Sequence, residues 1–168
     1  MNRSIRTALC LAACLAAPCF AQSRIDRAKS AVLLPFVAGD VKSSAGFLDA
    51  SRTTLLAVLK DEKVFAEVLS PEEAAGKDKA QLVEISAKLI EFKAGNMATR
   101  IMVGLGSGRA SAAFDFVLKD AATGNTLWQK VIKEKASVWS NSASSTAQRL
   151  ELPEKIANTL AKELLRGK

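Results

Sequence analysis

ASAAFDFVLKDAATGNTLWQKVIKEKASVW, residues 110–139, is the stretch that decides the fold, because its pattern predicts a β-hairpin. Apolar and polar side chains alternate along its first half, so one face of that strand would carry Phe114, Phe116 and Leu118. A second run with strand character begins at residue 126. The segment AATGN between the two runs, residues 121–125, has the composition of a tight turn. We therefore predict two antiparallel strands that this turn joins.

The residues before the hairpin predict a strand–helix–strand unit. SAVLLPFV, residues 30–37, and KVFAEVL, residues 63–69, are short apolar runs typical of buried strands. Between them, residues 46–60 repeat leucines at helical spacing. The predicted inner face of this helix carries Leu48, Leu55, Leu56 and Leu59, and the predicted outer face carries Asp49, Arg52 and Lys60.

A longer strand is predicted between this unit and the hairpin. QLVEISAKLIEFKAG, residues 81–95, alternates in part, which indicates burial on both faces. One face would carry Val83, Ile85, Ala87 and Leu89, and the other Leu82, Ile90 and Phe92. Before it, SPEEAAG, residues 70–76, has the pattern of a short helix, with Ser70 as cap and Glu73 able to close a capping box.

The last part of the chain predicts a loop and then a helix. SNSASSTAQ, residues 140–148, is polar and small, and PEKIANTLAKELLRGK, residues 153–168, predicts a helix that begins at Pro153. The whole pattern predicts an α/β fold with a single domain. Its mixed β-sheet would have about five or six strands, with the two main helices packed on one face.

The first residues have the layout of a secretory signal peptide. Two arginines precede a short apolar run, and a small-residue site follows, so we predict a signal peptide over residues 1–21 and a domain over 22–168. This would make the protein periplasmic. Removal of the leader leaves 22 basic and 17 acidic residues, a net charge of +5. The alternative is a lipobox in residues 11–14, with Cys14 acylated and the protein anchored to the outer membrane as a lipoprotein.

The composition offers little for catalysis. The chain has no histidine, and its three cysteines all lie in the predicted leader. The usual general base, the common serine triad and most zinc sites are therefore excluded, and we expect no enzyme activity, no cofactor and no bound metal. The pair Glu72–Glu73 sits where a first helical turn favours acids, and Asp115 and Asp120 belong to a strand and its turn. An acid-based hydrolase would need two carboxylates in one pocket.

The glycine-rich stretch RIMVGLGSGRA, residues 100–110, is the candidate binding motif. Gly104, Gly106, Gly108 and Arg109 resemble part of a phosphate loop, but strand alternation follows instead of a helix, so we interpret the stretch as a link between strands. The alternative is an anion-binding loop that uses Arg109. Trp139 is a second candidate, either as an exposed anchor for a partner or as a side chain packed on the core.

Basic residues gather mildly at positions 130–135 and near the end of the chain. Few aromatic residues lie among them, so we expect no nucleic-acid binding. A solvated face is the simplest interpretation, and weak attraction to anionic lipid or an envelope polymer is the alternative.

The order of these features resembles the bacterial domain-of-unknown-function family 4410. An arginine, a GxGxG link and a D-x-x-T-G strand end occur in this order, here as Arg100, residues 104–108, and then Asp120, Thr123 and Gly124. The resemblance implies a small exported protein or lipoprotein of the bacterial envelope. More distantly, the strand–helix–strand opening is similar to the curli-secretion lipoprotein and to lipoproteins that activate peptidoglycan synthases, a similarity of fold that transfers no site.

These observations favour an exported, non-enzymatic binding module that contacts another protein of the cell envelope. The alternative is a periplasmic protein that binds a small anion or a glycan through residues 104–109. The oligomeric state and the identity of the partner stay open at this point.

Overall fold

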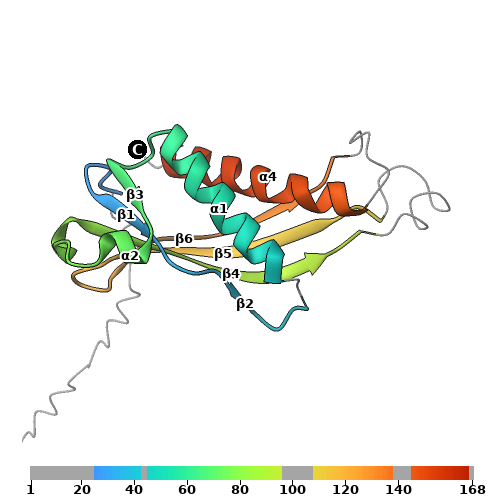
Figure 1. Cartoon of the computed structure of the whole chain (residues 1–168), viewed down its shortest axis with the longest axis horizontal. Helices are drawn as coiled ribbons and strands as arrows, with labels where there is room; N and C mark the ends of the chain where they lie inside the picture. Colours follow the sequence, from blue (N-terminus) through green and yellow to red (C-terminus); the bar gives the residue numbers. More distant parts are fainter. Residues whose placement is uncertain (1–24, 43–44, 96–107, 138–144, 167–168) are drawn as a thin grey trace, which may run out of the picture.

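A layer of helices lies on one side of a mixed β-sheet (Figure 1). The computed structural model describes residues 25–42, 45–95, 108–137 and 145–166. The predicted leader, with Cys14, lies outside this part of the chain. The two long helices, α1 (Ala45–Asp61) and α4 (Ser145–Arg166), run side by side over the same face of the sheet (Figure 1). The predicted α/β class and helix placement are confirmed.

Within the described residues the sheet has six strands, in the order β3-β1-β4-β5-β6, with β2 paired to β4. The strands are β1 (Ser30–Leu33), β2 (Val37–Ala38), β3 (Glu67–Leu69), β4 (Leu82–Lys93), β5 (Ser111–Asp120) and β6 (Thr126–Lys135). Strand β1 is parallel to both of its neighbours, β3 and β4. Strand β5 is antiparallel to both of its neighbours, β4 and β6. The sheet is therefore mixed, as the sequence predicts.

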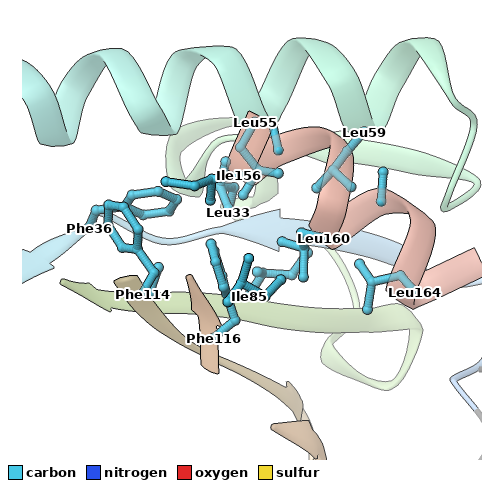
Figure 2. Close-up of a cluster of buried hydrophobic side chains, with 14 of the residues drawn as sticks. Leu33, Phe36, Leu55, Leu59, Ile85, Phe114, Phe116, Ile156, Leu160 and Leu164 are labelled. Carbon is cyan, nitrogen blue, oxygen red and sulfur yellow. The ribbon is translucent and has the colours of Figure 1, made fainter. Parts of the chain in front are cut away.

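The main core fills the space between the sheet and the two long helices. Phe114 and Phe116 of β5 are fully buried there, and the ring of Phe36 lies 5.5 Å from Phe114 (Figure 2). Leucines from both helices close the layer, among them Leu55, Leu59, Leu160 and Leu164. The predicted inward face of the hairpin strand, with Phe114, Phe116 and Leu118, is thus confirmed.

A short capped helix begins the connection between β3 and β4. In α2 (Pro71–Ala74), the Ser70 hydroxyl accepts from the N–H of Glu73, and the Glu73 carboxylate accepts from the N–H of Ser70 at 2.7 Å. This is the predicted capping box. A 3₁₀ turn, Lys79–Gln81, then leads into β4.

Two predicted strands are shorter than the apolar runs suggest. Residues 30–37 form β1 and then β2, with a break around Pro35, because proline has no N–H to donate to a ladder. In residues 63–69 only Glu67–Leu69 pairs with β1. Val64 and Phe65 are buried side chains of the loop before it. Their burial explains the apolar pattern without requiring a strand.

A β-bulge changes which face the end of β4 presents. The register with β5 shifts between Leu89 and Glu91, so that Ile90 is the extra residue. Beyond the bulge, Phe92 faces the helices, and its ring lies 4.7 Å from that of Phe47 in α1. The prediction that Phe92 shares the opposite face with Leu82 is therefore wrong. Simple alternation fails here because one residue is inserted.

Helix α4 begins at Ser145, eight residues before the predicted start at Pro153. Proline lacks the N–H that an interior helix position donates, which is why its presence suggests a first turn. Contacts made by the turn before the proline outweigh this: Leu152 is fully buried, and the Glu151 carboxylate accepts from the N–H of Ser137 at 3.1 Å. The predicted loop over residues 140–148 is thus wrong in its last part.

The outward prediction for Arg52 in α1 is also wrong. Its guanidinium donates to the carbonyl oxygen of Leu33 at 3.3 Å, across the space between the helix and β1. A long side chain can reach a strand carbonyl from a position that helical spacing places beside the core.

Candidate functional site: a basic hollow on the open face of the sheet

The sheet face that points away from α1 and α4 is polar over β4, β5 and β6, and we call it the open face. Helix α2 covers only its β1–β3 end, over a small cluster built on Val32, Leu69 and Leu82. In the described part of β4, β5 and β6, five lysines and three carboxylates face this side: Lys88, Lys93, Lys119, Lys133 and Lys135, with Glu84, Glu91 and Asp115. A sheet face that packs on no core alternates in this way with the apolar one.

One end of the open face is hollowed, and we call this place the basic hollow. Its volume is about 450 Å³. It is lined by Glu91, Lys93, Gly95, Gly108, Arg109, Ser111, Lys133 and Lys135. Four cationic side chains thus face one carboxylate. That balance favours an anionic ligand.

Strand register brings these side chains together. Glu91, Ala113 and Lys133 form one cross-strand row, and Lys93, Ser111 and Lys135 form the next. Neighbouring strands lie about 4.8 Å apart, so members of one row contact each other. The bulge after Leu89 is what places Glu91 in its row, because regular alternation would direct its carboxylate toward the helices.

Glu91 is the negative centre of the basic hollow. Its Oε2 lies 2.5 Å from the Lys133 ammonium, and its Oε1 lies 3.5 Å from that of Lys93. The hydrogen bond from Lys133 lowers the pKa of the Glu91 carboxyl below its usual value, although partial burial opposes this. Glu91 is therefore ionised at neutral pH and neutralises one of the four cations.

Arg109 lies at the edge of the basic hollow with spare hydrogen-bonding capacity. Its Nη1 donates to the carbonyl oxygen of Ala136 at 3.4 Å, and its buried Nε has no hydrogen-bond partner among the described residues. Gly108 before it has φ +67°, a backbone conformation that glycine adopts without strain. Both were predicted as binding residues, and both line the basic hollow. The predicted residues Gly104, Gly106 and Trp139, with Arg100, lie outside the described residues.

The carboxylates that the sequence analysis considers for catalysis bond to nearby residues. Asp120 caps the turn between β5 and β6, and its Oδ1 accepts from the N–H of Thr123 at 2.9 Å. Glu73 belongs to the capping box of α2. Asp115 lies on the open face, where both of its oxygens accept from the Gln129 amide at 3.0 Å. Each of these three carboxylates bonds its own local partner and not another of the three, so the geometry gives no support to a carboxylate pair.

The lysines of β6 are divided between two faces by the pleat. Lys133 and Lys135 face the basic hollow, whereas Lys130 faces α4 and pairs with Glu163 at 2.5 Å. On the same side, the Thr159 hydroxyl donates to Glu134 at 2.7 Å. Trp128 is half-buried against the core. Of the basic residues on β6, Lys133 and Lys135 thus line the candidate site, and Lys130 contacts α4.

A serine, a lysine and a glutamate meet where β6 ends. The Ser137 hydroxyl donates to Glu151 and accepts from the Lys155 ammonium at 2.8 Å, and Lys155 also lies 2.9 Å from Glu151. Burial raises the pKa of Glu151, but the bonds from Ser137 and Lys155 outweigh it and hold the pKa below its usual value. The lysine is therefore engaged as a charged donor. This cluster fastens the start of α4 to β6.

A second hollow, of about 630 Å³, lies along the free edge of β3. Its charged lining is mixed, and three of its charged groups already have partners. Arg27 donates to two carbonyls at the end of α4, Glu67 pairs with Lys77, and Glu73 caps α2. The basic hollow has four cationic side chains and one carboxylate, whereas the second hollow has three and two, so the basic hollow is the stronger candidate for an anion site.

Sequence reasoning missed Glu91, Lys93 and Ser111 as site residues, and it noted Lys133 and Lys135 only as members of a charged strand. The register of three strands was needed to bring them together. Within the described residues, no helix is both long and apolar enough to cross a bilayer, and no group of three or more metal-ligating side chains occurs.

Comparison with protein families gives one match. The model of the family described as a domain of unknown function, DUF4410, matches residues 37–139, which is more than half of the chain and includes β2 to β6. The basic hollow lies within this region. No curated protein matches the chain.

Solved structures share the fold. The PelC dodecamer from Paraburkholderia phytofirmans is similar with a TM-score of 0.53 and 15% identity, over 79% of this chain and 88% of that one. Protein XCC0632 from Xanthomonas campestris, of family DUF330, has a TM-score of 0.56 and 11% identity, over 82% and 86%. Protein CT253 from Chlamydia trachomatis has a TM-score of 0.51 and 9% identity, over 82% and 98%. At these identities the likeness shows the fold alone.

Proposed function

The chain belongs to the DUF4410 family, and from this premise we propose that it is an exported, non-enzymatic binding module of the bacterial cell envelope. Its partner is another envelope protein, which docks on the open face through acidic groups. The observation that carries this proposal is the contrast between the two faces of the sheet. One face is filled by α1 and α4, and the other presents charged side chains with an excess of lysine.

The charge of the open face supports an acidic partner. Five lysines face three carboxylates in the described part of β4, β5 and β6, and Arg109 adds a further positive charge at the basic hollow. Complementary charge accelerates encounter and selects partners more than it raises affinity. Docking should therefore weaken as ionic strength rises.

The proposed compartment rests on the first residues. The predicted signal peptide, residues 1–21, supports export, and the absence of histidine from the sequence supports a binding role instead of acid–base catalysis. Acylation of Cys14 is the alternative that would anchor the protein to the outer membrane. Intact mass spectrometry of the exported protein tests both: a mass that begins at Gln22 indicates the free form, and a lipid-modified Cys14 indicates the anchored one.

Site-directed photocrosslinking tests the docking surface. A crosslinker replaces Val131, which is 52% exposed on the open face, and in a matched control it replaces Thr53, which is exposed on α1. We expect an adduct with an envelope protein from position 131 and none from position 53. The same adduct should disappear when Lys133 and Lys135 are changed to glutamate.

The opposite pattern would contradict the proposal. Adducts from Thr53 alone would place the interface on the helical layer, and an adduct that survives both charge reversals would remove the electrostatic argument. Turnover of an envelope substrate by the purified chain would show that the protein is an enzyme.

A second candidate function is the binding of a small anion or a charged glycan. The observation that favours it is the basic hollow, where Gly108 and Arg109 meet Lys133 and Lys135. A volume of about 450 Å³ lies within the usual range for small-molecule sites. Titration of the protein with inorganic phosphate, followed by nuclear magnetic resonance, tests this function. Binding should be lost when Arg109 is changed to alanine.

The partner on the open face could also be a second copy of the chain. PelC, which shares the fold, is described as a dodecamer. In the described part of this chain, β3 and β6 are edge strands, and each has one side that pairs with no other strand. Free edges can pair with another copy. Native mass spectrometry of the exported protein gives its oligomeric state directly.

A further inference from the structure

We infer that the basic hollow is an anion site with two positions, of which Glu91 fills one and an external oxyanion fills the other. The external position is formed by Arg109 and Lys135. This inference rests on the second proposed function, anion binding at the basic hollow, and it adds the identity of the groups that hold the ligand and of the internal group that competes with it.

The first position already holds a carboxylate. Glu91 places one oxygen 2.5 Å from the Lys133 ammonium and the other 3.5 Å from that of Lys93. The Glu91 side chain is 30% exposed, so solvent still reaches this pair. Glu91 Oε1 has no hydrogen-bond partner among the described residues although that atom is buried. The carboxylate is thus held by the hydrogen bond from Lys133 and by the charge of Lys93, and its Oε1 keeps unused bonding capacity.

The backbone is shaped to place Glu91 there. Without the extra residue at Ile90, the pleat would direct position 91 toward α1 and the core. The bulge instead aligns Glu91 with Lys133 across Ala113. Bulges commonly re-aim a side chain beside a binding site. The bulge in β4 therefore fixes the Glu91 carboxylate inside the basic hollow.

The second position has cations without an internal counter-ion. Arg109 and Lys135 both line the basic hollow, and within the described residues neither forms an ion pair with a carboxylate. The Arg109 Nε is buried and has no hydrogen-bond partner in the described part of the chain, which leaves a donor of the guanidinium unused there. A buried donor without an acceptor is costly, and an oxyanion would satisfy it.

The chemistry of these groups selects the ligand. Guanidinium and ammonium groups bind the oxygens of carboxylate and phosphate, and a guanidinium can hold two oxygens at once. Ser111 lies across from Lys135 in the same row, is only 4% exposed and lines the basic hollow, so it adds a buried hydroxyl group to the lining. The shared chemistry is an anionic group with at least two oxygens. It can come from a uronic-acid sugar or from a phosphate group.

Titration of the full chain distinguishes these sources and tests the role of Glu91. The probes are inorganic phosphate, galacturonate and, as the uncharged comparison, galactose, each followed by nuclear magnetic resonance at low and moderate salt. The variants are Glu91→Gln, Arg109→Ala and Lys135→Ala. Lys79→Ala, in the 3₁₀ turn before β4, is the matched control because Lys79 is exposed and does not line the basic hollow. Circular dichroism confirms that each variant is folded.

We expect Glu91→Gln to tighten anion binding by about two- to fivefold, because an exposed ion pair is worth little and its loss frees Lys133. Arg109→Ala should weaken binding at least about tenfold, since it removes charged hydrogen bonds. Lys135→Ala should weaken binding by about two- to fivefold, and Lys79→Ala should leave it unchanged. The gain from Glu91→Gln should shrink as salt rises. Preference between phosphate and galacturonate identifies the source of the anion.

The other outcomes separate failure of the two-position site from failure of anion binding itself. If the wild type binds an anion but Glu91→Gln weakens or does not change that binding, Glu91 only orients the lysines, and the two-position site is wrong while anion binding stands. If the wild type does not bind and Glu91→Gln does, the competitor role is supported. If neither binds, or if galactose binds as well as galacturonate, anion recognition at the basic hollow is itself wrong.

Discussion

The Lys29 ammonium lies 2.8 Å from Oδ2 of Asp120, and this ion pair joins the segment before β1 to the turn between β5 and β6. Strand β4 lies between β1 and β5, so the pair reaches across the sheet. The other oxygen of Asp120 accepts from the N–H and the hydroxyl of Thr123, and Gly124 closes the turn with φ +71°. The D-x-x-T-G pattern is thus explained by the turn that Asp120, Thr123 and Gly124 form and by the ion pair between Asp120 and Lys29.

Changing Asp120 to alanine should lower the stability of the fold, because it removes the turn cap and the Lys29 pair together. Lys29→Met removes only the pair and keeps the bonds from Thr123, so its effect should be smaller. Urea denaturation followed by tryptophan fluorescence measures both. An equal loss in the two variants would mean that the turn bonds contribute nothing.

The same carboxylate predicts a pH dependence. The hydrogen bond from Lys29, together with the bonds from Thr123, lowers the pKa of Asp120 from 3.8 to about 2. A carboxyl whose pKa is lower in the folded state adds stability above pH 3.8, and this stability is lost as the pH falls through about 2. Urea midpoints measured between pH 5 and pH 2 should therefore fall more steeply in the wild type than in Asp120→Asn.

Gly39 is required by a close approach to β4. A Cβ at this position would lie 2.9 Å from the carbonyl oxygen of Leu89 and 3.0 Å from Cε of Lys88. Gly39→Ala should lower the free energy of unfolding by about 1–3 kcal/mol, since the clash is partly with backbone. Gly46→Ala is the control, because among the described residues nothing outside its chain neighbours and its own helix backbone lies within 4 Å of its Cβ position. It should leave stability unchanged or raise it by less than about 1 kcal/mol. Thermal denaturation of both variants decides whether the clash matters.

The parts of the fold that the sequence predicts are those in which local pattern and tertiary burial agree. The alternation around Phe114 predicts β5 and its hairpin, and the leucine spacing of residues 46–60 predicts α1. Pro153 shows the reverse case. Its local preference indicates a helix start. Burial of Leu152 and the bonds of Glu151 nevertheless stabilise helical turns before the proline, so the helix begins at Ser145.

The sequence predicts some residues of the candidate site and not others, because part of the site depends on the register between strands. Arg109 stands out in the sequence because it follows three glycines. Glu91 and Lys133 are 42 residues apart, and only a register that includes the bulge brings them together. A bulge inserts one residue and leaves no composition signal at Ile90, so single-sequence alternation assigns the wrong face to every position after it.

Arg27 should act as a cap for α4. Its Nη2 donates to the carbonyl oxygens of Leu164 and Leu165 at 2.8 and 2.7 Å, where the helix has no N–H of its own to offer. Arg27→Ala should cost about 1–3 kcal/mol and speed hydrogen exchange in the last turn of α4. Arg27→Lys keeps the charge but not the planar fork and should recover only part of the loss. Exchange measured by mass spectrometry would contradict this role if the last turn were as protected in Arg27→Ala as in the wild type.

Phe114 should be the most sensitive aromatic position of the core. It is fully buried, and its ring centroid lies 5.5 Å from Phe36, 5.7 Å from Phe116 and 6.1 Å from Phe47. Phe114→Ala should therefore cost about 3–5 kcal/mol, because it removes apolar contacts and leaves a cavity between the sheet and α1.

Two further variants keep this prediction testable if Phe114→Ala does not fold. Phe114→Leu retains part of the volume and should cost about 1–2 kcal/mol. Val131→Ala, on the open face and 52% exposed, should change stability by less than about 0.5 kcal/mol. Urea denaturation of the three proteins gives the ranking. If Val131→Ala were as damaging as Phe114→Leu, the open face would have to be a second packed surface, and its role as a docking face would fail with it.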